Sequence, residues 1–146
     1  MNRKYKIIIH VIIPVLIGGF IYILFRENNL LMFSWFESLG LDSITNYLRN
    51  NYLFNNQIPE WIIYSLPDGI WIYSFTSLML IIWYRDSNKI KYYWLLIGPI
   101  LGVSAEICQL IEIIPGTYDN LDLAFCICGS FIPFYIFSNQ KTRRIK

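Results

Sequence analysis

Apolar residues dominate four long stretches of the chain, and charged residues are concentrated between them. The stretches cover approximately residues 7–25, 67–84, 92–114 and 121–137. An α-helix of about 20 residues crosses the roughly 30 Å hydrocarbon core of a bilayer, and each stretch reaches or approaches that length. The pattern therefore predicts an all-α protein, an integral membrane bundle of four transmembrane helices that forms a single membrane domain over residues 1–146.

The composition is typical of membrane proteins, with 55% hydrophobic and 18% aromatic residues. The formal net charge of +2 is too small to favour a nucleic-acid partner. Cys108, Cys126 and Cys128 all fall inside predicted spans, and their spacing lacks the pattern and the histidine partners of a zinc site. We interpret these cysteines as small residues that pack between helices.

The basic residues predict how the spans are oriented. All of them except Arg26 and Arg49 lie before the first span, between the second and third spans, or after the fourth. These regions share one side of the membrane, and the positive-inside rule assigns that side to the cytoplasm. We therefore expect a multi-pass protein of the cell (cytoplasmic) membrane with both termini in the cytoplasm.

The segment of residues 26–60 is then expected on the extracytoplasmic side, between helices 1 and 2. Its apolar residues, including Trp35 and Phe36, are interleaved with polar ones, a pattern that suits helices lying in the membrane interface. Asp42 and Ser43 indicate a helix start within the segment. Two interpretations stay open: the segment is a lid over the bundle, or Trp35 and Phe36 contact a lipid-linked ligand.

Five charged or amide side chains map to the outer half of the predicted spans, where a bilayer should exclude them. They are Asp68, Glu106, Gln109, Asp119 and Asp122. Ionisable groups at this depth are costly, so by default they indicate a functional site. Glu106 and Gln109 are three residues apart and share one helix face, and Tyr73 extends a polar line below Asp68.

The three aspartates also have a structural explanation, because each lies near the predicted start of a helix. A carboxylate in the first turn can cap free N–H groups and interacts favourably with the helix dipole. We favour capping for Asp68, weigh it equally against a site role for Asp119, and favour it less for Asp122, which lies deeper.

Glu106 has no such explanation, because it lies within a helix and no basic residue is predicted at its depth. In one hypothesis it is protonated and hydrogen-bonded to Gln109 or Tyr73. In the other it is charged and binds a cation together with the neighbouring aspartates. Carboxylates without histidine or thiolate ligands would favour Mg²⁺ or Ca²⁺. His10, the only histidine, is expected at the cytoplasmic interface, far from this group.

Small residues lie on the same helix faces as the polar group. Gly98 and Gly102 continue the Glu106 face toward the cytoplasm, and Gly129 follows Asp122 in the fourth span. Small residues at this spacing let transmembrane helices approach closely. We therefore expect a closely packed bundle that opens into a polar cavity at its outer end.

The last third of the chain carries a run of polar and small residues: Ser104–Gln109, then Pro115-Gly116-Thr117, Asp119, Asp122 and Gly129. This run resembles the VanZ-like membrane protein family. Thr117 stands where the family usually has arginine, which would remove a partner for an anionic ligand, and Cys126 stands where asparagine is usual. The resemblance implies a role in the cell envelope and a link to glycopeptide antibiotic resistance, and it supplies no reaction.

Two hypotheses of function result. In the first, an outer-leaflet polar pocket binds or modifies an envelope lipid or a lipid-linked precursor, with Glu106 and Asp122 as candidate catalytic residues. The candidate ligand-binding residues are Gln109, Asp119, Asp68 and Tyr73. In the second, the chain is a non-enzymatic subunit that packs against another membrane protein through its small and polar helix faces. The sequence contains no nucleophile motif or phosphate loop and no evident cofactor site, so whether it is an enzyme stays open.

Overall fold

Helices form the regular structure of the part of the chain that is described. The computed structural model describes residues 2–28, 30–51, 58–83, 88–114 and 117–142. In chain order the elements are α1 (Arg3–Ile7), the π-helical segment η1 (Ile8–Ile12), α2 (Ile13–Phe25), α3 (Leu31–Ser38), α4 (Asp42–Asn51), α5 (Glu60–Ile63), α6 (Ser65–Ile82), α7 (Ile90–Leu110) and α8 (Asn120–Thr142).

Four helical units are long and apolar enough to cross a membrane. They are Arg3–Phe25, Glu60–Ile82, Ile90–Leu110 and Asn120–Ser138. The first unit runs through α1, η1 and α2, and the second comprises α5 and α6. The prediction of an all-α chain with four potential spans is therefore confirmed.

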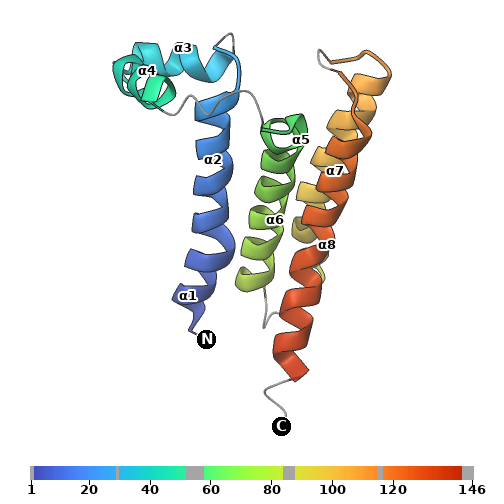
Figure 1. Cartoon of the computed structure of the whole chain (residues 1–146). Helices are drawn as coiled ribbons and strands as arrows, with labels where there is room; N and C mark the ends of the chain where they lie inside the picture. The colour runs from blue at the N-terminus through green and yellow to red at the C-terminus, as the bar shows by residue number, and fades with distance from the viewer. Residues whose placement is uncertain (1, 29, 52–57, 84–87, 115–116, 143–146) are drawn as a thin grey trace.

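The helix α6 lies at the centre of the bundle. It packs against α8, α2, α7 and η1, whereas α7 packs against α6 and α8. The helix α1 and the end of α8 lie at one end of the bundle, and α3 and α4 lie across the opposite end, above α2 (Figure 1). We call the end that carries α3 and α4 the distal end, and the end that carries α1 the proximal end.

Small and polar residues form most of the buried face of α6. They are Ser65, Pro67, Gly69, Ser74, Thr76 and Ser77. Large apolar side chains such as Phe20, Leu101 and Phe131 are instead exposed on the outside of the bundle. This distribution suits a lipid environment, where helices associate through close packing of small residues rather than through burial of large ones.

Pro14 explains the π-helical segment of the first helical unit. Proline has no N–H, and in a regular helix its ring would clash with the carbonyl four residues earlier, which here belongs to His10. The wider turn of η1, which ends two residues before Pro14, accommodates this clash. This segment packs against α6.

The second helical unit begins at Glu60 rather than near residue 67. A turn at Tyr64 separates α5 from α6. Pro67 cannot donate to the carbonyl of Ile63, so the break falls where proline removes that hydrogen bond. The apolar residues before Pro67 therefore belong to the span instead of leading into it.

The third helix ends at Leu110 rather than near residue 114, because a Schellman motif closes it. The Ile113 N–H donates to the Cys108 carbonyl at 2.9 Å, and the Glu112 N–H donates to the Gln109 carbonyl at 3.0 Å. Glu112 has φ = 58°, in the left-handed region that favours glycine. The motif satisfies the last helical carbonyls, and Gln109 consequently lies in the final turn of α7.

Candidate functional site

Three carboxylates from three helices gather at the distal end of the bundle. Asp68 lies in the first turn of α6, Glu106 near the end of α7, and Asp122 in the first turn of α8. Each interacts electrostatically with the other two. We call these three residues, together with Gln109, the distal cluster.

Glu106 is the least exposed carboxylate of this cluster, with 5% of its surface exposed. Its carboxylate accepts a hydrogen bond from the backbone N–H of Asp119. The second oxygen, Oε2, has no hydrogen-bond partner among the described residues, and the same holds for the buried Oε1 of Gln109 and Oδ1 of Asp122. The cluster therefore presents three buried acceptor oxygens without donors.

Asp119 performs the capping role that the sequence left open. Its Oδ1 accepts a hydrogen bond of 2.8 Å from the Leu121 N–H, and its side chain is exposed. This is the geometry of an N-cap carboxylate at the start of α8. Asp119 thus contacts the cluster through its backbone N–H, while its carboxylate stabilises the helix end.

The structure does not place Asp68 at the helix N-cap, where a capping role was expected. The N-cap residue of α6 is Tyr64, and no side-chain hydrogen bond caps it. The helix begins at Ser65, earlier than predicted, so Asp68 lies inside the first turn. From there its carboxylate faces the charges of Arg26 and Asp122.

Tyr73 lies apart from the distal cluster. Its phenolic oxygen is 2.6 Å from Nδ1 of His10, so it is not the partner of Glu106 that the sequence suggested. The ring of His10 is half-buried and packs edge-on against Phe137 at a centroid distance of 5.3 Å, and its expected position at the cytoplasmic interface stays a prediction. His10 lies in η1, and this segment packs against α6, which carries Tyr73.

Arg26 is a residue near the cluster that the sequence analysis did not identify. Its guanidinium lies over the rings of Tyr22 and Tyr64, at 4.9 and 4.7 Å from their centroids. Its charge acts attractively on Asp68. The signal in the sequence was its position, since Arg26 and Arg49 are the two basic residues on the side opposite the termini.

Arg49 secures the backbone that carries Arg26. Its guanidinium donates to the carbonyls of Ile23 at 3.3 Å and of Arg26 at 2.7 Å, and it lies over the Phe33 ring. These are carbonyls at the C-terminal end of α2, where cations interact favourably with the helix dipole. The α4 helix is thereby tied to the end of α2.

The distal cluster does not have the arrangement of a metal site. Among the described residues, no group of three or more histidine, cysteine, aspartate or glutamate side chains could hold a metal ion. Mg²⁺ and Ca²⁺ require several oxygen ligands at short, regular distances. The described residues therefore do not bring together the three carboxylates of the cation site considered from the sequence, which were Glu106, Asp119 and Asp122.

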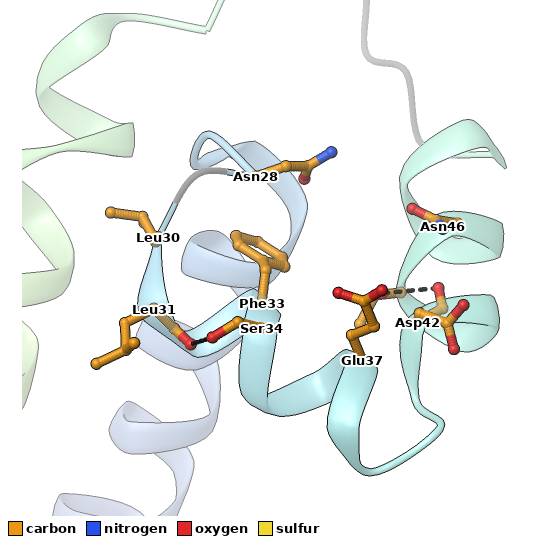
Figure 2. Close-up of a pocket in the computed structure, with 9 residues that line it drawn as sticks. Asn28, Leu30, Leu31, Phe33, Ser34, Glu37, Asp42 and Asn46 are labelled. Atoms are coloured by element: carbon orange, nitrogen blue, oxygen red, sulfur yellow. Dashed lines mark hydrogen bonds between the residues drawn. The ribbon is translucent and has the colours of Figure 1, made fainter.

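A separate groove of about 500 Å³ lies between α3, α4 and the loop that follows α2. Figure 2 shows Glu37 and Asp42 on one side of it and Phe33 and Asn28 on the other. The hydroxyls of Ser34 and Thr45 are already bonded to the carbonyls of Leu31 and Asp42. Neither Trp35 nor Phe36 lines this groove, so the suggested ligand contact of these two residues stays a prediction.

The glycines expected at helix contacts lie against neighbouring helices of the same chain. A Cβ atom on Gly98 would lie 2.7 Å from the Phe75 ring, and one on Gly102 would overlap Ile72 of α6. Gly129 lies directly against the Gly69 backbone. These small-residue faces are therefore occupied by packing between α6, α7 and α8.

The fold defines the class of the chain: an all-helical protein with four helices long and apolar enough to cross a membrane. No protein-family model, curated protein or solved structure matches the chain. Of the residues on which the VanZ-like resemblance rests, Pro115 and Gly116 lie outside the described residues.

Proposed function

We propose that the chain is a multi-pass membrane protein whose distal cluster binds the polar headgroup of an envelope lipid or a lipid-linked precursor. The observation that supports this function is the burial of Glu106 with Oε2 unpartnered, beside two further unpartnered oxygens on Gln109 and Asp122. Each buried acceptor without a donor costs about 1–3 kcal/mol. A ligand that supplies the missing donors would recover this free energy.

The charge pattern supports an outward-facing site. Basic residues concentrate at the proximal end, which the positive-inside rule assigns to the cytoplasm, so the distal end faces the outer leaflet in this proposal. The helices α3 and α4 then form the extracytoplasmic segment and lie in the outer interface. A lipid headgroup at that level reaches the cluster without crossing the apolar centre of the bilayer.

The proposal covers binding and extends to modification of the ligand through Glu106 and Asp122. In an acid–base step, one of these two carboxyl groups would give a proton and the other would accept it. The resemblance to the VanZ-like family, carried by Glu106, Gln109, Asp122 and Gly129, agrees with an envelope role and with an effect on glycopeptide susceptibility. The subunit hypothesis stays a prediction. The small-residue faces already pack against helices of the same chain, so a partner protein would need contacts in addition to these.

The test compares lipids that co-purify with the wild type and with Glu106→Gln in mild detergent, identified by mass spectrometry. We expect a specific lipid to be enriched in the wild type and lost in Glu106→Gln. Glu112→Gln is the matched control, since Glu112 carries the same charge at the end of the same helix and is exposed. Equal lipid content in all three forms, with a stoichiometric protein partner, would favour the subunit hypothesis instead.

A further inference from the structure

The chemistry of the distal cluster restricts which headgroup it can bind. Its unpartnered atoms are oxygens of Glu106, Gln109 and Asp122, and the carboxylate of Asp68 adds further negative charge nearby. A phosphate or carboxylate placed among them would be repelled and would bring no donor. The complementary group is a cation that carries several N–H donors.

A primary ammonium group meets this requirement. It has three N–H donors and no acceptor, which matches the three unpartnered oxygens in number and in polarity. Hydrogen bonds between an ammonium and carboxylates are charge-assisted and stronger than neutral ones. A quaternary ammonium carries the same charge but no N–H, so it could not satisfy these oxygens.

Arg26 provides a second contact of opposite sign beside the cluster. Its guanidinium lies over the rings of Tyr22 and Tyr64, and one NH2 group donates to the Tyr64 carbonyl at 3.5 Å. Its buried Nε has no hydrogen-bond partner among the described residues. Arg26 is close enough to Asp68 for their charges to attract each other. A guanidinium is well suited to contact phosphate. The site thus places a phosphate contact next to an ammonium contact.

We propose that the distal cluster recognises a primary ammonium beside a phosphate, as in the headgroup of an aminophospholipid, with the ammonium on Glu106, Gln109 and Asp122 and the phosphate on Arg26. This inference rests on the proposed function and specifies its ligand. Asp68 interacts electrostatically with Arg26 and with Glu106 and Asp122, so its charge helps to neutralise both cations.

The test measures binding of phosphatidylethanolamine, its N-methyl and N,N-dimethyl derivatives, and phosphatidylcholine to the full chain in mild detergent by native mass spectrometry. The series keeps the positive charge and the phosphate while it removes N–H donors one by one. We expect affinity to fall at each step, with phosphatidylcholine at least about tenfold weaker than phosphatidylethanolamine. This comparison uses only the wild type, so it does not depend on the folding of any variant.

Single-residue variants test which side chains contact the ammonium and which side chain contacts the phosphate. Glu106→Gln and Asp122→Asn should reduce the preference for phosphatidylethanolamine over phosphatidylcholine, whereas Glu112→Gln should keep it. Arg26→Gln should weaken all four lipids by a similar factor and leave their ratio unchanged. Circular dichroism and thermal unfolding in the same detergent show whether each variant is folded.

The outcomes separate this inference from the proposed function. Equal binding of all four lipids that is lost in Glu106→Gln would retain a lipid site and overturn the ammonium assignment. Tighter binding of phosphatidylglycerol, which has no ammonium, would do the same. If soluble phosphoethanolamine competes as effectively as the lipid does, the assignment to a lipid is overturned. The same follows if the chain binds a lysine-containing peptide but binds all four lipids of the series equally. Binding of no phospholipid at all would overturn both proposals.

Discussion

Nδ1 of His10 and the hydroxyl of Tyr73 are joined by a hydrogen bond of 2.6 Å across 63 residues of sequence. The pair connects η1 of the first helical unit to α6. The His10 ring also packs edge-on against Phe137 of α8. Two half-buried polar side chains thereby satisfy each other within an apolar bundle, as buried polar groups generally do. The bundle thus contains a polar contact separate from the distal cluster.

Tyr73→Phe should destabilise the protein by about 1 kcal/mol, because it leaves Nδ1 of His10 without its partner while the aromatic ring stays in place. The measurement is the free energy of unfolding in mixed detergent micelles, followed by circular dichroism. Tyr93→Phe is the control, since Tyr93 is 73% exposed. Equal stability of the two variants would show that the His10 contact contributes nothing.

Gly129→Ala should destabilise the bundle by about 1–3 kcal/mol, because the added methyl group would overlap the Gly69 backbone and force α6 and α8 apart. Gly19→Ala adds the same methyl group to a helix at a position with nothing within 4 Å. Thermal unfolding in detergent should therefore show a lowered midpoint for Gly129→Ala and no loss for Gly19→Ala. Similar behaviour of the two would contradict the observed backbone contact.

Glu112→Gly should stabilise the protein by up to about 1 kcal/mol, because glycine adopts the left-handed conformation without the steric cost of a Cβ atom. Gly40 occupies the equivalent position after α3, with φ = 70°, where the Leu41 N–H donates to the Phe36 carbonyl at 2.8 Å. Gly40→Ala should accordingly be destabilising. Unfolding midpoints of the two variants should shift in opposite directions, and a shift in the same direction would contradict this account.

Both termini should lie in the cytoplasm, and α3 should lie outside, because the basic residues concentrate at the proximal end. A membrane-impermeant maleimide tests this in intact cells, with a cysteine introduced at the exposed Ser38 of a chain whose native cysteines are replaced by serine. We expect labelling of Ser38→Cys, and none of a cysteine at Asn2 before the cells are permeabilised. The reverse pattern would overturn the orientation and the outward-facing site.

The sequence allows one to anticipate that Glu106 and Asp122 lie near each other. A short connection between two antiparallel helices brings the end of one helix to the start of the next. The position of Arg26 could not be anticipated in the same way. Its contact with the rings of Tyr22 and Tyr64 depends on the angle at which the chain leaves α2, and Arg49 of α4 helps to set that angle. Such an angle is a property of several elements together.

The end of α7 is a second such case. Apolar residues continue to Ile114, so hydropathy predicts a longer helix than the one that forms. The helix stops at Leu110 because Glu112 takes up a left-handed conformation and closes a Schellman motif. Sequence reasoning expects glycine or asparagine at that position, so glutamate gave no signal.

The sequence by itself determined the number of long apolar helices, their approximate extent and the gathering of carboxylates toward one end of the bundle. These properties follow from local hydropathy and from the alternation of direction between successive helices. Only the tertiary structure decided which polar groups pair, as with Tyr73 and His10, and which stay unpartnered, as with Oε2 of Glu106. The physical reason is that the partner of a side chain depends on the rotation of each helix about its axis, which is set by packing between residues far apart in the chain, such as Gly69 and Gly129.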